Sequence, residues 1–152
     1  KFLLKRHHFA LKRQNTQDRS MKSLVVEDDL ISRTVLQEML KTFGTVSSVT
    51  NGFEALKEVE DSLTSNSYYD LICLDIMMPE MDGHTVLKKI RAFEEQYALP
   101  TDSSAKIIMT SALNDFNHIR NSYANLCDGY LVKPIDKNRL ILELRKLELV
   151  QQ

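Results

Sequence analysis

After residue 20, short apolar runs alternate along the chain with longer amphipathic segments. Short continuous apolar runs are typical of strands buried on both faces, whereas apolar residues three or four positions apart are typical of helices. The pattern predicts strands at 24–26, 45–49, 69–74, 106–110 and 129–132. It predicts helices at 30–43, 52–63, 86–93, 114–123 and 140–149. Five such alternations predict an α/β fold in which helices cover both faces of a parallel sheet.

The apolar positions also predict which helix faces are buried. In the first helix these are Val35, Leu36, Met39 and Leu40, and Gly44 is expected to end that helix. The second helix is expected to bury Phe53, Leu56, Val59 and Leu63, with a polar loop over 62–67. The leucines of the last helix exceed one narrow buried stripe, so one or two are expected in an interface; they are Leu140, Leu144, Leu147 and Leu149.

Composition fits one globular domain. The chain has 152 residues, 43% hydrophobic and 27% charged, which is enough for a real core. The net charge of −1 gives no reason to expect direct contact with nucleic acid or membrane. No apolar stretch approaches the ~20 residues that cross a bilayer. Cys73 and Cys127 stand in apolar surroundings, which favours two buried thiols in a reducing cytoplasm over a disulfide.

The charge is unevenly distributed. Residues 1–20 hold six basic side chains and one acid, a net +5, while the remainder carries −6. Met21 stands immediately before the first predicted strand. We interpret residues 1–20 as a basic leader outside the fold, either left over from expression or an upstream segment, and residues 21–150 as the folded domain. The alternative is a short amphipathic basic helix that docks on a partner or membrane surface.

Charged side chains stand where three predicted strands end. Glu27, Asp28 and Asp29 follow the first strand, Asp75 ends the third, and Lys133 follows the fifth. The carboxyl ends of parallel strands open onto the ligand crevice of an α/β sheet, and buried charges need partners or a metal. The arrangement therefore predicts one site that takes a hard cation and an anion. Capping of the first helix, to which we assign Asp29, is the alternative role for all three acids that follow the first strand.

The residue types suit phosphoryl chemistry. Mg²⁺ prefers oxygen ligands, which Asp28 and Asp75 can supply directly and Glu27 through a water. A carboxylate can act as a nucleophile toward a phosphoryl group, and transfer needs mainly positioning and charge neutralisation. We therefore predict Asp75 as the nucleophile, Lys133 as its charge partner and the Ser111 hydroxyl as a donor to a phosphoryl oxygen.

Four blocks of the sequence, in order and between about residues 22 and 147, resemble the receiver domain of two-component response regulators. They are Leu24–Asp29, Leu74–Gly83, Thr110–Ala112 and Asp128–Pro134. The resemblance, closest in kind to chemotaxis regulators, implies a flavodoxin-like (βα)5 fold. Its doubly wound parallel sheet would have the strand order 2-1-3-4-5.

The same resemblance implies roles for the acidic residues. Asp75 becomes the phosphoacceptor, loaded from a histidine kinase or a phosphotransfer protein. The metal, Mg²⁺ or Mn²⁺ in its place, would be held by Glu27, Asp28, Asp75 and the backbone carbonyl of Met77. Lys133 becomes the lysine that pairs with the phosphoryl group. The activity expected is Mg²⁺-dependent self-phosphorylation and slow self-dephosphorylation, not that of an ordinary enzyme.

The resemblance also implies a switch. Ser111 matches the switch hydroxyl and Tyr130 the switch aromatic, and Pro134 follows Lys133 through a bond that is typically cis. Phosphorylation would then change the surface formed by the predicted fourth helix, fifth strand and last helix. A downstream protein target, or a second copy in a homodimer, would bind that surface.

Departures from the family pattern qualify this interpretation. Met77 has no polar group to orient an attacking water, so we predict slow loss of the phosphoryl group. A phosphohydrolase of the haloacid dehalogenase type is one alternative, although it would need an acid where Met77 stands. A degenerate receiver that binds partners without phosphorylation is another, and a receiver belonging to a larger hybrid kinase or regulator is a third. We expect no output domain in the chain as given and a cytoplasmic location.

Overall fold

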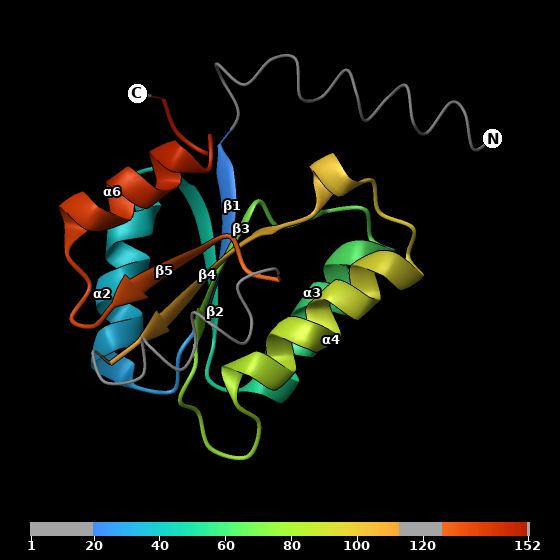
Figure 1. Cartoon of the computed structure of the whole chain (residues 1–152), viewed down its shortest axis with the longest axis horizontal. Helices are drawn as coiled ribbons and strands as arrows, with labels where there is room; N and C mark the ends of the chain where they lie inside the picture. The colour runs from blue at the N-terminus through green and yellow to red at the C-terminus, as the bar shows by residue number, and fades with distance from the viewer. Residues whose placement is uncertain (1–19, 113–125, 152) are drawn as a thin grey trace.

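The computed structural model describes residues 20–112 and 126–151, which form a parallel sheet between two layers of helices (Figure 1). The strand order is β2-β1-β3-β4-β5, as predicted. The strands are β1 (Met21–Val26), β2 (Gly44–Val49), β3 (Leu71–Asp75), β4 (Lys106–Ser111) and β5 (Gly129–Val132). The helices are α2 (Leu30–Lys41), α3 (Gly52–Thr64), α4 (Gly83–Gln96) and α6 (Lys137–Lys146), with a 3-10 turn η1 (Thr101–Ser103). The helix predicted at 114–123 and residues 1–19 of the predicted leader lie outside the described residues.

The two helix layers cover opposite faces of the sheet, α2 with α6 on one side and α3 with α4 on the other (Figure 1). Side chains alternate along each strand, so Val25 and Cys73 enter the α2–α6 layer while Leu24 and Leu74 enter the α3–α4 layer. Cys73 and Cys127 are both buried and neither forms a disulfide, which confirms the prediction of two thiols. In the part of the chain that is described, no helix combines the length and apolar character that a bilayer crossing requires.

Side-chain caps start the four α-helices of the described part of the chain. Each cap is an Asp or Asn whose oxygen accepts the backbone N–H three residues later, a bond that satisfies a free amide of the first turn. The caps are Asp29, Asn51, Asp82 and Asp136. The predicted role of Asp29 at a helix N-terminus is therefore confirmed, at 2.7 Å from the Ser32 amide.

The first strand and helix differ from the predicted boundaries. β1 begins at Met21, three residues earlier than predicted, because the whole segment pairs with β2. Gly44 does not end α2; it opens β2 with φ of 155°. A Cβ at Gly44 would lie 2.0 Å from the Met21 carbonyl oxygen, so only glycine fits this close approach of the two strands.

The last helix is displaced from its predicted range of 140–149. It begins at Lys137 because Asp136 caps it, and it ends at Lys146. Glu148, with φ of 57°, turns the chain back, and the Leu149 amide donates to the Leu144 carbonyl. Leu147 and Leu149 therefore follow the helix and pack against the α2–α6 layer.

Three further side chains contradict the predicted burial. Val35 and Phe53 are exposed, whereas Ser62, predicted in a loop, is buried in α3. The buried stripe of α3 runs through Gly52, Ala55, Val59 and Ser62. Phe53 is two residues from Ala55, about 200° around the helix, and so points away from the sheet.

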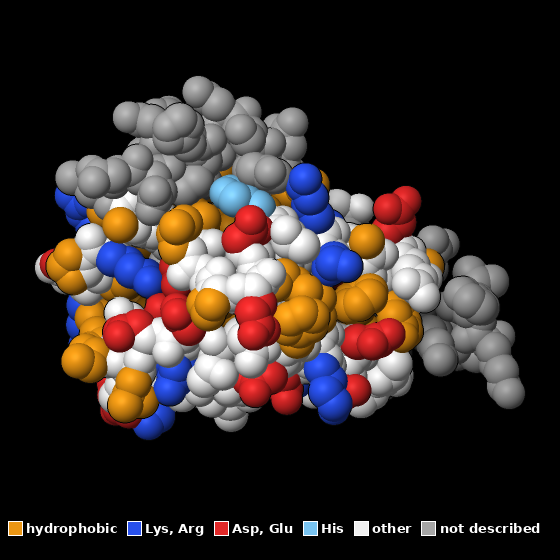
Figure 2. All heavy atoms as spheres, turned by 90° about the horizontal axis from the view of Figure 1, so that it is seen from below, with side chains coloured by type: hydrophobic (Ala, Val, Ile, Leu, Met, Phe, Trp, Pro, Cys, Tyr) orange, Lys and Arg blue, Asp and Glu red, His pale blue; other side chains and the backbone are white. Residues whose placement is uncertain are grey.

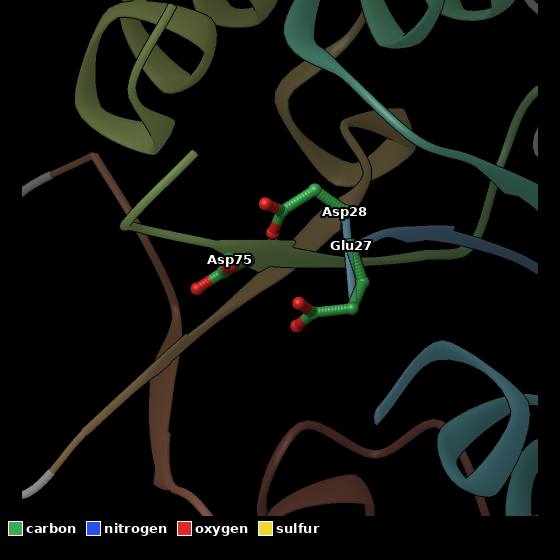
Figure 3. Close-up of side chains that lie close together, drawn as sticks. All are labelled: Glu27, Asp28 and Asp75. Atoms are coloured by element: carbon green, nitrogen blue, oxygen red, sulfur yellow. The ribbon is translucent and has the colours of Figure 1, made fainter. Parts of the chain in front are cut away.

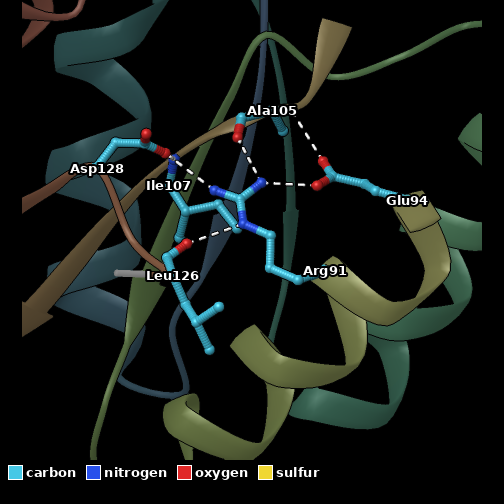
Figure 4. Close-up of polar contacts among 6 residues, drawn as sticks. All are labelled: Arg91, Glu94, Ala105, Ile107, Leu126 and Asp128. Atoms are coloured by element: carbon cyan, nitrogen blue, oxygen red, sulfur yellow. Dashed lines mark hydrogen bonds and ion pairs between the residues drawn. The ribbon is translucent and has the colours of Figure 1, made fainter. Parts of the chain in front are cut away.

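Arg91 ties α4 to the amino ends of β4 and β5 (Figure 4). Its guanidinium donates to the carbonyls of Leu126 at 2.8 Å and Ala105 at 2.9 Å. It also forms ion pairs with Glu94 at 2.7 Å and Asp128 at 3.0 Å, with only 19% of its side chain exposed. This network fastens the end of the sheet opposite to the predicted site.

Candidate functional site

The carboxylates of Glu27, Asp28 and Asp75 gather at the carboxyl edge of the sheet (Figure 3). β1 and β3 are parallel neighbours in which Val26 pairs with Leu74. The next residues along each strand, Glu27 and Asp75, therefore emerge side by side. One carboxylate oxygen from each of the three acids lies within 4.8 Å of the others. Glu27 and Asp75 are buried, and Asp28 is exposed.

Lys133 joins this cluster from the end of β5. Its ammonium Nζ lies 2.6 Å from Glu27 Oε2 and 3.1 Å from Asp75 Oδ1. About a quarter of the Lys133 side chain is exposed, against 3% for each of its two partners. One ammonium thus lies between two buried carboxylates, and the following Lys133–Pro134 peptide bond is cis, as predicted.

The pKa values of Asp75 and Lys133 are shifted by burial and by the position of the lysine between two carboxylates. Burial, and then the charge of Glu27, raise the pKa of Asp75 to about 7, although Lys133 pulls it down. Burial alone would lower the pKa of Lys133, but Glu27 and Asp75 outweigh it and the pKa of the lysine is raised. The site is therefore short of positive charge, which favours a divalent cation.

Hydrogen bonds hold the acidic loop in place. Glu27 Oε1 accepts from the Asp29 amide at 3.2 Å. Arg33, one turn into α2, donates from Nη1 to the carbonyls of Glu27 at 2.9 Å and Asp28 at 3.3 Å. Sequence reasoning missed Arg33, although its spacing of four residues from the cap Asp29 places it over the first turn of the helix.

The predicted switch residues lie on β4 and β5. Ser111 is buried at the end of β4, next to Thr110, which pairs with Asp75. The Lys133 amide donates to the Ser111 carbonyl at 2.8 Å, which brings lysine and serine to the same edge. Tyr130 lies three residues before Lys133; its ring packs against the α3–α4 layer and its hydroxyl is buried. Burial, and then Cys127, raise the pKa of this hydroxyl.

The loop between β3 and α4 forms the rim beside Asp75. The Met77 amide donates to Asp75 Oδ1 at 3.3 Å, while its apolar side chain is 65% exposed. The loop returns to the strand at Gly83, whose amide donates to the Ile76 carbonyl at 2.9 Å. A Cβ on Gly83 would lie 2.3 Å from the Asp75 carbonyl oxygen, so glycine is required for this approach.

The donor set fits a hard divalent cation. Three carboxylates, two of them buried, offer oxygen ligands of the kind that Mg²⁺ and Mn²⁺ take in proteins. Without a cation, the ammonium of Lys133 is shared between the buried carboxylates of Glu27 and Asp75. The fold and the site together define a class: doubly wound α/β domains with an acidic cation site and a lysine at the carboxyl edge of the sheet.

The family within this class is shown by comparison with known proteins. The family model for the response regulator receiver domain matches residues 23–145. The chain therefore belongs to the receiver domains of two-component and phosphorelay signalling. Receiver domains are signalling modules and not ordinary enzymes, so membership argues against the phosphohydrolase alternative.

Individual relatives agree with this assignment. Chemotaxis protein CheY of Listeria monocytogenes serovar 1/2a is 32% identical over 128 residues, which cover 83% of this chain and 97% of that protein. Hybrid signal transduction histidine kinase L of Dictyostelium discoideum is 40% identical over 118 residues, which cover 76% of this chain but 7% of the kinase. The crystal structure of the receiver domain of the histidine kinase CKI1 from Arabidopsis thaliana, complexed with Mg²⁺, has a TM-score of 0.72 and 31% identity. It covers 85% of this chain and 92% of the other.

Proposed function

We propose that this receiver accepts a phosphoryl group on Asp75 from the phosphohistidine of a histidine kinase or a phosphotransfer protein. The observation that carries the proposal is the position of the buried Asp75 carboxylate. Oxygens of Glu27 and Asp28 lie within 4.8 Å of it, and the Lys133 ammonium lies 3.1 Å away. A carboxylate so placed can attack phosphorus, while the breaking P–N bond leaves its electron pair on the donor imidazole.

The residues of the site divide the work of the transfer. Glu27, Asp28, Asp75 and the backbone carbonyl of Met77 would hold Mg²⁺ or Mn²⁺, which neutralises charge on the phosphoryl oxygens. Lys133 already contacts Asp75 and would pair with the phosphoryl group. The Ser111 hydroxyl would donate to another phosphoryl oxygen from the end of β4.

The response to phosphorylation is proposed to pass along β4 and β5. Movement of the Ser111 hydroxyl toward the phosphoryl group would change the space available to Tyr130, which pairs with Met109 of β4. Pro134, which follows Lys133 through a cis peptide bond, would be the third switch residue. The surface that changes would include a groove along β5 and α6, where a downstream protein or a second copy of the chain would bind. It is lined by Tyr130, Leu131, Val132, Arg139, Leu142, Glu143 and Lys146.

We also propose the bounds of the domain, its location and the class of its partners. We assign residues 21–150 to the receiver, with residues 1–20 as a leader, which the family match over 23–145 supports. The buried thiols of Cys73 and Cys127, which form no disulfide, support a reducing cytoplasm. With a net charge of −1 for the whole chain and −6 after residue 20, the protein is expected to act on proteins and not directly on nucleic acid or membrane. The phosphoryl group is expected to leave slowly, because Met77 offers no group to orient water.

Incubation with acetyl phosphate and Mg²⁺, followed by intact mass spectrometry, tests the transfer. We expect a mass increase of one phosphoryl group that requires Mg²⁺ and is absent from Asp75→Asn. An unchanged mass under saturating donor and Mg²⁺, or an increase that persists in Asp75→Asn, would overturn the proposal.

A further inference from the structure

The Arg33 side chain contacts the backbone carbonyls of Glu27 and Asp28 and not their carboxylates. Its Nη1 atom donates to the carbonyl oxygens of Glu27 at 2.9 Å and Asp28 at 3.3 Å. Arg33 is half-buried and lies on α2, whose cap Asp29 immediately follows Glu27 and Asp28 in the chain. One side chain thus joins a rigid helix to the two residues that present carboxylates to the cation site.

The loop needs such a contact because few other bonds fix it. Glu27 is held by its amide, which donates to the Val49 carbonyl at 3.2 Å, and by its side chain on Lys133 and the Asp29 amide. Asp28 is exposed, and the bond to its carbonyl is supplied by Arg33. Side chains that orient metal ligands without touching the metal commonly change metal affinity 10- to 100-fold when they are removed.

We propose that Arg33 is a positioning residue for the cation site, which holds the carbonyls of Glu27 and Asp28 so that their carboxylates face Asp75. This inference rests on the cation site of the proposed function. A donor bound to two carbonyls restricts the loop to one backbone conformation. The loop then loses less conformational entropy when the ion binds.

Charge alone would have the opposite effect. A guanidinium near a cation site repels the ion, so loss of the charge without any loss of position would tighten metal binding. Loss of position weakens binding instead. The sign of the change in affinity therefore separates the two roles of Arg33.

The test is Mn²⁺ binding by the whole chain, followed through the electron paramagnetic resonance signal of the free ion. We expect the dissociation constant of Arg33→Met to rise about 10-fold. Arg33→Lys keeps the charge but loses the fork of donors, so a smaller rise of about threefold is expected. The matched control is Lys41→Met, which removes a cation from the far end of the same helix and should leave the affinity within about twofold.

Unchanged or tighter Mn²⁺ binding in Arg33→Met would overturn the inference. If circular dichroism shows that Arg33→Met does not fold, the Mn²⁺ affinity of Arg33→Lys is the test. An affinity of Arg33→Lys equal to that of the wild type would then overturn the inference. Phosphorylation supplies the second readout: the Mg²⁺ concentration for half-maximal rate should rise by the same factor while the rate at saturating Mg²⁺ is kept. Mn²⁺ binding is measured without phosphodonor, so it tests Arg33 independently of phosphorylation. Failure of the wild type to accept a phosphoryl group would overturn the proposed function, but the Mn²⁺ affinities would still decide the role of Arg33.

Discussion

The Lys133 ammonium lies closer to Glu27, at 2.6 Å, than to Asp75, at 3.1 Å. The lysine that is proposed to pair with the phosphoryl group is therefore bound mainly to a second acid. Transfer would require Lys133 to exchange at least part of its bond to Glu27 for a phosphoryl oxygen. Binding of a cation by Glu27 would make that exchange easier, because the acid would no longer need the lysine.

The shared lysine predicts how Glu27→Gln changes Asp75. The charge of Glu27 raises the pKa of Asp75, and the same acid holds Lys133. Its removal should lower the pKa of Asp75 from about 7, for both reasons. Carbon-13 NMR titration of the aspartate carboxyl groups in metal-free protein measures this, with Asp75→Asn to identify the signal. A pKa that stays the same or rises would contradict the account of the shared lysine.

Stability without metal should depend on pH through Asp75. Its pKa of about 7 in the folded state exceeds the ordinary value of 3.8, so the folded state binds this proton more tightly. Stability from this group is present below the ordinary pKa and is lost as the pH rises through about 7. Asp75→Asn does not lose stability in this way, because asparagine has no carboxyl group to ionise. Its stability advantage in urea should therefore widen by up to about 3 kcal/mol between about pH 5 and about pH 8 in EDTA.

A constant difference between the two proteins over that range would contradict the raised pKa of Asp75. Mg²⁺ should abolish most of the difference, because the bound cation would stabilise the ionised carboxylate.

Met77→Asn is expected to shorten the lifetime of the phosphorylated protein several-fold. The Met77 side chain is exposed beside Asp75 and is apolar, whereas an amide there can orient an attacking water. The decay of the phosphorylated species is followed by intact mass after the donor is removed. Phe53→Asn, which changes another exposed apolar residue to the same amide, is the control and should decay at the wild-type rate. Equal lifetimes for wild type and Met77→Asn would refute the prediction.

Arg91→Met should destabilise the domain by about 3–5 kcal/mol, because it removes the ion-pair partner of the buried Glu94 carboxylate and the donor to the carbonyls of Leu126 and Ala105. Urea denaturation measures this. Lys57→Met removes an exposed i,i+4 pair with Asp61 and should change the stability little. A small effect of Arg91→Met would show that the network is dispensable.

Much of the fold could be predicted because local signals agree with the topology. Buried parallel strands such as β3 are apolar up to their last residue, here Asp75, and Asp29 lies at a cap position that its residue type favours. Parallel strands also place their following residues at one edge, so Glu27, Asp28 and Asp75 could be grouped before their distances were known.

Other features depend on contacts that a linear pattern does not contain. The exposure of Phe53 follows from the rotation of α3 on the sheet, and the end of α6 follows from the backbone turn at Glu148. Likewise, the preference of Lys133 for Glu27 has no sequence signature. The spacing of Arg33 from Asp29 places it near the loop but does not show which carbonyls it contacts. Each depends on a distance of a few ångströms between separate elements.

Location of the phosphoryl group on the chain is the most direct test of phosphoryl transfer to Asp75. Protein treated with acetyl phosphate and Mg²⁺ can be reduced with borohydride, which converts an aspartyl phosphate to homoserine, and then mapped by peptide mass spectrometry. We expect homoserine at position 75, dependent on Mg²⁺ and strongly diminished in Lys133→Met. Homoserine at another aspartate, or unreduced Asp75 in a protein that had gained the phosphoryl mass, would contradict it.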